Sequence, residues 1–223
     1  MTATDDLFAA IRAGDLAGVD RLLTERPYLA GSSDAGGLSA VTVAAYHHRQ
    51  PILERILAAN PELDRFEAAI VGDLPRLAEL LSETDAEPID QRSADGFTAL
   101  HLAAFFGRFR AVQELLDRGA DPNAWATGAL RVQPLHSAVS AGHEAVARLL
   151  VEHGADPDQA QDGGYTPLHA AAQNGLSELC DFLVASGANP DALTEDILTP
   201  ADLAERAGHR DLAAHLRAIT TSA

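Results

Sequence analysis

Hydrophobic and polar residues follow one another along this chain with the spacing of short helices. Apolar side chains recur at intervals of three and four residues, as Leu212, Leu216 and Ile219 do near the C-terminus. This spacing puts them on one face of a helix and leaves the other face to polar residues. A short helix cannot bury its apolar face alone, so the pattern predicts an all-α protein whose helices stack against their neighbours.

One four-residue pattern, a polar residue followed by Pro-Leu-His, recurs at nearly constant intervals. Its leucine position is occupied by Leu100, Leu135, Leu168 and Ala201, which are separated by 35, 33 and 33 residues. Such a period is typical of a solenoid built from repeats. The copies are Thr98-Ala99-Leu100-His101, Gln133-Pro134-Leu135-His136, Thr166-Pro167-Leu168-His169 and Thr199-Pro200-Ala201-Asp202.

A second motif recurs in phase with the first. Gly119-Ala120-Asp121-Pro122-Asn123-Ala124, Gly154-Ala155-Asp156-Pro157-Asp158 and Gly187-Ala188-Asn189-Pro190-Asp191-Ala192 each follow a pair of apolar residues. Together the two motifs closely resemble those of the ankyrin repeat. The resemblance implies an all-α ankyrin-repeat solenoid of stacked helix-turn-helix units with short β-hairpin loops. Asp202, in place of the motif's histidine, suits a terminal repeat.

The first ninety residues resemble the ankyrin motif more weakly. Ala9-Ala10, Ala44-Ala45 and Ala68-Ala69 stand at the offsets of the paired alanines. Only 24 residues separate the turn positions His48 and Gly72, so we expect a hairpin to be missing there, with residues 60–64 as a tight link. The sequence predicts about seven repeats in a single domain, 1–223, with divergent repeats over about 4–92 and regular ones over about 93–217.

Small and polar residues define where the expected helices begin and end. The threonine of the motif can cap the first helix of a repeat, and proline suits the first helical position. Glycines such as Gly107 and Gly175 permit the positive φ common at a helix exit. Paired alanines let adjacent first helices approach closely. Asp5 and Asp6 could serve as cap and dipole partner of the first helix.

Charge restricts the kinds of partner. The net charge is −17, from 33 acidic and 16 basic residues, all the basic ones being arginine. Nucleic acids and anionic membranes would be repelled, whereas a basic protein would be attracted. The alternative is that the charge only maintains solubility. With one cysteine, Cys180, no apolar run long enough to cross a bilayer and no secretory leader, we expect a cytoplasmic protein. We also expect the protein to be a monomer.

The sequence contains no arrangement that predicts catalysis, a metal or a cofactor. His101, His136 and His169 recur because the motif recurs, and in the family this histidine is similar to an internal hydrogen-bonding strut. The acidic stretch from Asp156 to Gly163 lacks the ligands of a calcium loop. P-loop, dinucleotide-binding and nucleophile-elbow motifs are missing. We therefore expect no enzyme.

Partner binding is the function that the resemblance implies, through a concave face of hairpin tips and first-helix positions. Those positions carry several of the chain's few aromatic residues, which are frequent anchors of interfaces. A hairpin with two extra residues adds an apolar loop. The candidates are Tyr46, Ile70, Val71, Phe97, Phe105, Phe106, Trp125, Leu130, Arg131, Tyr165, Gln173, Asn174 and Arg206.

Each candidate has a plainer interpretation. Phe105 and Phe106 could pack between repeats instead of facing a partner, and Trp125 could fold back over its own hairpin. The leading hypothesis is an adaptor or regulator that binds an unidentified protein or peptide. The alternatives are a protein that associates with itself and one that binds a small ligand in an unfamiliar pocket.

Overall fold

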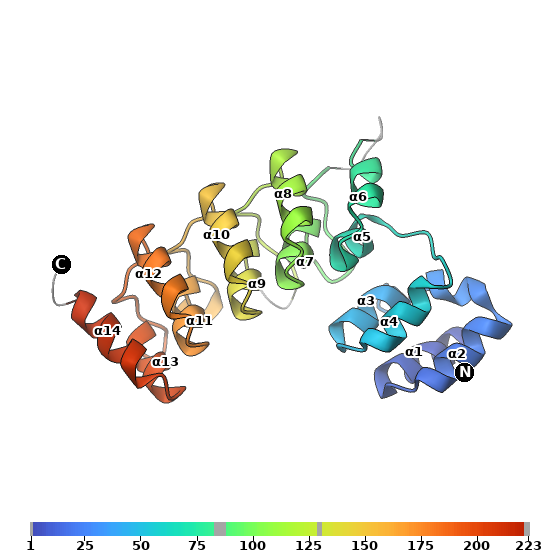
Figure 1. The fold of residues 1–223 in the computed structure, drawn as a ribbon, viewed down its shortest axis with the longest axis horizontal. Coiled ribbons are helices and arrows are strands. Elements are labelled where there is room, and N and C mark those ends of the chain that lie inside the picture. Colours follow the sequence, from blue (N-terminus) through green and yellow to red (C-terminus); the bar gives the residue numbers. More distant parts are fainter. Residues whose placement is uncertain (1, 83–87, 129–130, 221–223) are drawn as a thin grey trace.

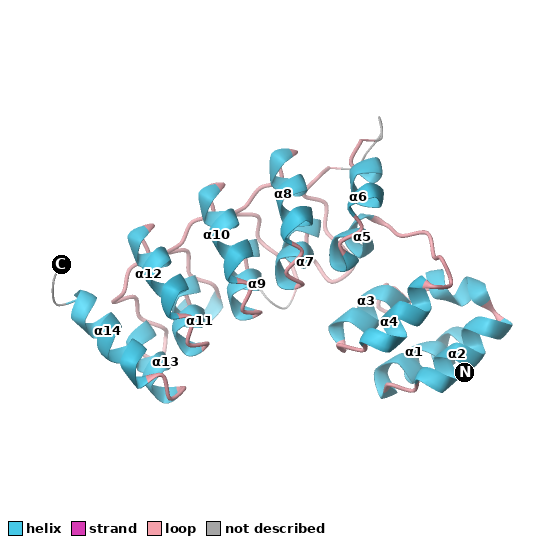
Figure 2. Ribbon diagram, viewed as in Figure 1, coloured by secondary structure: helices cyan, strands magenta, loops and turns pink. Residues whose placement is uncertain are grey.

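The computed structural model describes residues 2–82, 88–128 and 131–220, which form fourteen α-helices and two short 3-10 helices, with no strand (Figure 2). The helices follow one another in pairs, each joined by a tight turn. The first four pairs are α1 (Ala3–Ala13) and α2 (Leu16–Glu25), α3 (Ala40–Tyr46) and α4 (Gln50–Leu57), α5 (Arg65–Val71) and α6 (Leu74–Leu80), and α7 (Ala99–Phe105) and α8 (Phe109–Asp117). The others are α9 (Pro134–Ser140) and α10 (Glu144–Glu152), α11 (Pro167–Gln173) and α12 (Ser177–Ala185), and α13 (Pro200–Arg206) and α14 (Arg210–Thr220).

The pairs from α5 to α14 line up as an arch, with first helices on its inner side and second helices on its outer side (Figure 1). The inner row α5, α7, α9, α11 and α13 packs helix against helix, as does the outer row α6, α8, α10 and α12. The expected all-α solenoid is therefore confirmed.

Short hairpin loops join most pairs, as expected. Two of these loops are each closed by one antiparallel bridge. It joins Ser33 to Ser39 in the first and Arg92 to Thr98 in the second. Neighbouring hairpins also bond to one another, since the Thr127 amide donates to the Gly96 carbonyl at 3.0 Å. These backbone bonds hold the loops in a row beside the inner helices.

The motif residues explain how each inner helix starts. The Thr98 and Thr166 side chains accept hydrogen bonds from the amides of His101 and His169, so both threonines are N-caps. The paired alanines of α7 and α11, Ala103-Ala104 and Ala171-Ala172, are completely buried, and their small side chains allow the neighbouring inner helices to approach closely. The N-cap of α1 is Thr2 and not Asp5, which completes a capping box from inside the helix, while Asp5 and Asp6 lie in the first turn as the expected dipole partners.

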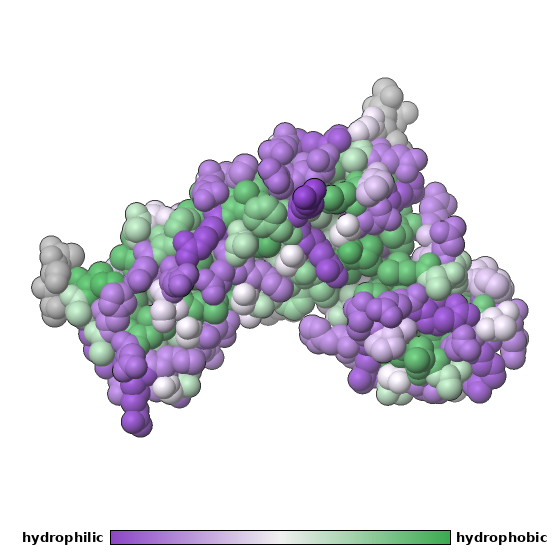
Figure 3. All heavy atoms as spheres, viewed as in Figure 1, coloured by the Kyte–Doolittle hydropathy of each residue, from purple (hydrophilic) through white to green (hydrophobic). Residues whose placement is uncertain are grey.

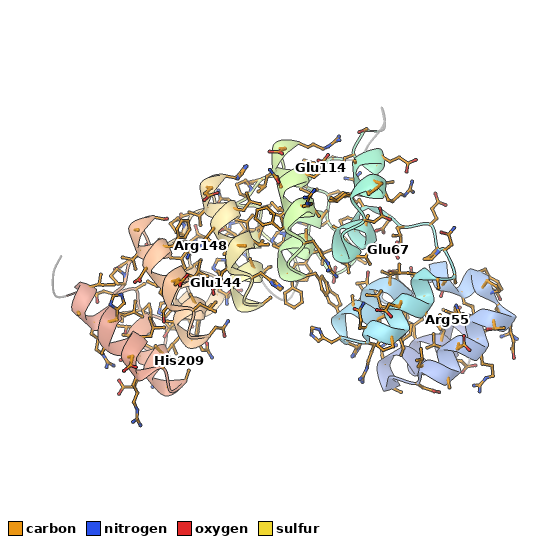
Figure 4. The ribbon with its side chains drawn as sticks, viewed as in Figure 1. Arg55, Glu67, Glu114, Glu144, Arg148 and His209 are labelled. Carbon is orange, nitrogen blue, oxygen red and sulfur yellow. The ribbon has the colours of Figure 1, made fainter. Side chains whose placement is uncertain are left out.

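In two of the turns inside the pairs, a glycine lies under the imidazole ring of the next pair. Gly107 has φ +67°, and a β-carbon added there would lie 2.6 Å from the His143 ring of the next pair. Gly175 and His209 repeat this arrangement at the start of α14 (Figure 4). The Gly-His turns of the motif are therefore contacts between successive pairs as well as helix exits.

The regular stacking is interrupted between α4 and α5. Residues 60–64 join these helices as an extended link, and no hairpin lies there, as the spacing predicts. One apolar core runs from α5 to α14. A second fills α1 to α4 and is closed by Ile70 of α5 and Leu102 of α7. The α3–α4 pair consequently comes close to the α7–α8 pair.

Candidate functional site

Three aromatic rings meet where the α3–α4 pair approaches α7. Tyr46, at the end of α3, stacks on Phe106 with ring centroids 5.8 Å apart and planes 22° apart. Phe105 stands nearly perpendicular to both, at 6.5 Å from Tyr46 and 5.2 Å from Phe106. These are favourable offset and edge-to-face geometries. All three rings are half-buried, so Phe105 and Phe106 both pack between pairs and keep part of their surface open.

A hydrogen bond fixes this aromatic cluster to the neighbouring hairpin. The Tyr46 hydroxyl donates to Asp95 Oδ2 at 2.6 Å, and Ser93 Oγ donates to the other oxygen of the same carboxylate. Burial, together with the nearby carboxylate, raises the pKa of Tyr46 far above its usual range. The phenol therefore remains a donor, and Asp95 is held with both oxygens occupied.

An apolar cavity of about 290 Å³ opens beside this cluster, and we call it the aromatic pocket. It lies between α3, the 93–98 hairpin, α7 and α9. Its walls are mostly rings and aliphatic side chains, and Asp95 is its one carboxylate among the described residues. The residues that line it are Tyr46, Asp95, Phe97, His101, Leu102, Phe105, Val132, His136, Ser137 and Ser140.

The recurring histidines form the floor of the inner surface and are structural. His101 Nδ1 lies 2.8 Å from Thr98 Oγ1, and its Nε2 donates to the Val132 carbonyl of the next hairpin at 3.0 Å. His169 does the same with Thr166 and the Leu198 carbonyl. Burial lowers the pKa of His101 and of His136 to about 4. The interpretation of His101 and His169 as internal struts is therefore consistent with their geometry, whereas the buried His136 Nε2 has no hydrogen-bond partner among the described residues.

The structure corrects one predicted contact residue. Ile70 was expected on the exposed inner face, but it is fully buried, with 0% of its surface accessible. The missing hairpin lets the α3–α4 pair cover this end of α5, and Ile70 joins the core between them. Its neighbour Val71 is half-buried against the same core.

In the loop with two extra residues, Val132 lines the aromatic pocket, whereas Trp125 does not. Trp125 is half-buried, and the Arg131 guanidinium sits 5.4 Å from its ring centroid, as in a cation–π contact. Arg92 donates twice to the Trp125 carbonyl, at 2.9 and 3.2 Å. The tryptophan is thus held by its own loop and the preceding hairpin. Leu130 lies outside the described residues.

The remaining candidates lie further along the arch. Tyr165 is half-buried and its ring lies 5.8 Å from that of His169, the same relation as between Phe97 and His101. Asn174 is exposed, but its amide donates to the Val139 and Ser140 carbonyls. Gln173 and Arg206 are exposed. The structure does not bring these residues into the aromatic pocket.

A second cavity, of about 590 Å³, adjoins the aromatic pocket, and Phe105 and Ser140 line both. It opens among the turns of the α3–α4, α7–α8 and α9–α10 pairs. We call it the turn groove. Its cationic and imidazole residues are His48, Arg49, Arg108 and His143. Sequence analysis missed this site; the available signal was the basic residue just before the second helix of a pair, where other pairs have Asp15 or Asp73.

Titratable groups elsewhere form no further constellation in the described part of the chain. No cluster of three or more His, Cys, Asp or Glu side chains able to hold a metal occurs among the described residues. Burial raises the pKa of the Cys180 thiol to about 12. Across the same residues, no helix has the length and apolar character that a bilayer crossing requires.

Apolar residues reach the surface over the middle of the arch, between polar regions (Figure 3). The large exposed apolar side chains, in contrast, lie on separate elements, except for Leu193 and Ile197, which share one loop. Tyr28 is 74% exposed in the 3-10 helix Pro27–Gly31, and Phe109 is 41% exposed at the start of α8. Isolated exposed residues of this kind carry little meaning. The aromatic pocket is therefore the strongest candidate for binding.

Comparison with known proteins identifies the framework. The family model described as "Ankyrin repeats (3 copies)" matches residues 7–126, 65–161 and 126–194. The chain is 34% identical over 97 residues to the serine/threonine-protein kinase TNNI3K of Mus musculus, a match covering 40% of this chain and 12% of that protein. It is 41% identical over 93 residues to the probable E3 ubiquitin-protein ligase XBOS31 of Oryza sativa subsp. japonica, covering 40% of this chain and 20% of that protein.

A third relative is the 2-5A-dependent ribonuclease of Mus musculus, which is 44% identical over 59 residues, covering 25% of this chain and 7% of that protein. The matches span at most a fifth of these relatives, so the activities that the names state belong to those whole proteins. What the chain shares with all of them is the repeat framework. The family model matches most of the chain, and the helix pairs and capped inner helices agree with it. The chain therefore belongs to the ankyrin-repeat family.

Proposed function

We propose that this protein is an adaptor or regulator that binds a partner protein or peptide through its inner surface. Ankyrin repeats are generally protein–protein interaction modules. Such domains are typically non-catalytic, and we propose that this chain is no enzyme. The single observation that carries the proposal is the aromatic pocket, an apolar cavity walled by Tyr46, Phe97 and Phe105.

The geometry favours an apolar side chain of the partner as the group bound. Rings already fixed by stacking lose little conformational entropy when a partner arrives. Buried aromatic contacts of this kind are frequent hot spots, worth about 2 kcal/mol or more each. The inner helices and hairpins extend the surface on both sides, which suits a standard interface of roughly 800 Å² on each partner.

Affinity capture with matched variants tests the proposal. Immobilised wild-type protein, Phe97→Ala and the control Tyr28→Ala are each exposed to lysate of the source cell, and the bound proteins are quantified by mass spectrometry. We expect one protein to be retained by wild type and by Tyr28→Ala, and at least tenfold less by Phe97→Ala. Circular dichroism first establishes that all three are folded.

Two results would contradict the proposal. Equal recovery by Phe97→Ala and wild type would remove the aromatic pocket from the interface. A sedimentation mass that rises above the 23.5 kDa of one chain with concentration, and that Phe97→Ala returns to the monomer, would instead assign this surface to self-association.

A further inference from the structure

The turn groove concentrates positive charge in a protein that is strongly negative overall. Against a net charge of −17, its described lining residues include Arg49, Arg108, His48 and His143 and no carboxylate. Some arginines elsewhere are paired with acids, for example Arg55 with Asp20 and Arg118 with Glu114, both at 2.6 Å. Neither Arg49 nor Arg108 takes part in an ion pair among the described residues.

Backbone contacts hold the two arginines in place. Arg108 Nε donates to the Ile70 carbonyl at 2.7 Å, and its aliphatic stem lies over Gly72. The Arg49 guanidinium lies against Gly14 and donates to the Arg12 carbonyl at 3.4 Å. A carbonyl accepts from one of the five N–H donors of a guanidinium and does not neutralise its positive charge. The remaining donors are positioned and uncompensated, which suits a planar or tetrahedral oxyanion.

Residues at the starts of the second helices add to this positive character. Arg49, Arg108 and His143 are the N-cap residues of α4, α8 and α10, and none of them makes a side-chain cap bond. In α2 and α6 the same position is occupied by Asp15 and Asp73, whose carboxylates accept amide hydrogen bonds. Helices α4 and α8 have no acidic residue in their first turns and keep the partial positive charge that an acidic cap offsets in α2 and α6, whereas α10 has Glu144 in its first turn.

The groove exists because of the interruption in the solenoid. Its described lining comes from the α3–α4, α7–α8 and α9–α10 pairs and skips α5 and α6, which lie between them in sequence. The extended link at 60–64 brings the turn of α3–α4 toward that of α7–α8, and Phe105 and Phe106 form the wall between them. An uninterrupted stack would separate these turns by a whole pair.

We propose that the turn groove binds an oxyanion, a phosphate or a carboxylate group. The shared wall at Phe105 and Ser140 places this anion next to whatever occupies the aromatic pocket. This step rests on the proposed function: the partner segment then carries an anionic group beside the apolar side chain that enters the aromatic pocket. The overall charge favours a basic partner at long range, whereas the groove selects an acidic or phosphorylated group at contact.

Amide NMR of the whole chain tests the site without a known partner. ¹⁵N-labelled protein is titrated with sodium phosphate, with acetate as the carboxylate probe, at constant ionic strength maintained with sodium chloride. We expect saturable shifts confined to the turns near Arg49, Arg108 and His143. A phosphate-only response identifies a phosphoryl group as the anion, a stronger response to acetate identifies a carboxylate, and equal responses show an oxyanion site that accepts both.

Matched variants separate the site from general charge. Arg49→Gln and His143→Gln should each weaken phosphate binding at least fivefold. Arg110→Gln removes the same charge from the exposed side of α8 outside the groove, and it should leave binding unchanged, as should Phe97→Ala in the aromatic pocket. Shifts scattered over the surface, or equal losses in Arg49→Gln and Arg110→Gln, would overturn the proposal. Because Phe97→Ala spares the groove, failure here and failure of partner binding are distinguishable.

Discussion

At the scale of single residues, the buried histidines decide how the inner surface responds to acid. His101 and His136 are neutral in the folded protein, because burial lowers the pKa of each to about 4. In the unfolded chain they titrate near 6.5. Below pH 6.5 the unfolded chain therefore takes up protons that the folded protein does not, and the free energy of unfolding falls.

We accordingly expect stability to be nearly constant above about pH 7.5 and to decrease between pH 6.5 and 4, by roughly 3 kcal/mol for each of the two histidines across that window. Urea denaturation at a series of pH values measures it. His101→Gln should make the decrease shallower, whereas His47→Gln, at an exposed position, should leave it unchanged. Identical slopes in wild type and His101→Gln would show that His101 is not the group responsible.

At the scale of helices and turns, the sequence predicts most of the fold because the repeat motif is local. Thr98 and Thr166 cap their helices, and the alanine pairs of α7 and α11 are buried, as the motif requires, whereas Ala9 in the divergent first repeat is exposed. Ile70 shows where prediction from the repeat motif fails. Its position in the repeat is an exposed one, but burial depends on which pair lies next to it in space. That depends on the path of an extended link, which no periodic pattern encodes.

The aromatic pocket could be predicted in part for the same reason. The motif placed Tyr46, Phe97 and Phe105 on the inner side, but the Tyr46–Asp95 hydrogen bond joins residues 49 positions apart across the interruption. The basic residue before the second helix was a signal for the turn groove, but it does not predict the site by itself, because Arg49 and Arg108 line one groove only when α3–α4 meets α7–α8. Both sites arise where the chain departs from its repeat.

The turns offer a prediction with an internal control. Gly107→Ala places a β-carbon 2.6 Å from the His143 ring, whereas Gly142→Ala has a similar φ, +78°, and open space around it. Gly142→Ala should cost about 1 kcal/mol for the left-handed backbone, and Gly107→Ala about 2–3 kcal/mol, because the clash adds to that cost. Urea denaturation measures both.

The double variant Gly107→Ala, His143→Ala then isolates the clash. With the ring removed, the cost of Gly107→Ala should return to that of Gly142→Ala. If Gly107→Ala and Gly142→Ala cost the same in the wild-type background, the contact between successive pairs contributes nothing, and the glycine is needed only for its backbone angle.

At the scale of the whole molecule, the two apolar cores determine which helices unfold together. Helices α1 to α4 share one core, and α5 to α14 share the other. We call the contact between the two parts the joint; it consists of Ile70, Leu102 and the ring cluster of Tyr46, Phe105 and Phe106. Stability in a solenoid is close to a sum of local terms and nearest-neighbour contacts. Both candidate sites lie at the joint, so partner binding and the docking of the first two pairs depend on the same residues.

This arrangement predicts that the two parts lose their structure separately. Ile11→Ala truncates a fully buried side chain in the first core and should cost about 2–5 kcal/mol. Hydrogen exchange measured by mass spectrometry should then rise across α1 to α4 and stay slow across α9 to α14. Leu150→Ala, equally buried in the second core, should raise exchange across α9 to α12. If Ile11→Ala instead raises hydrogen exchange uniformly as far as α14, the loss of stability in the first core also destabilises the second core, and the protein unfolds as one cooperative unit.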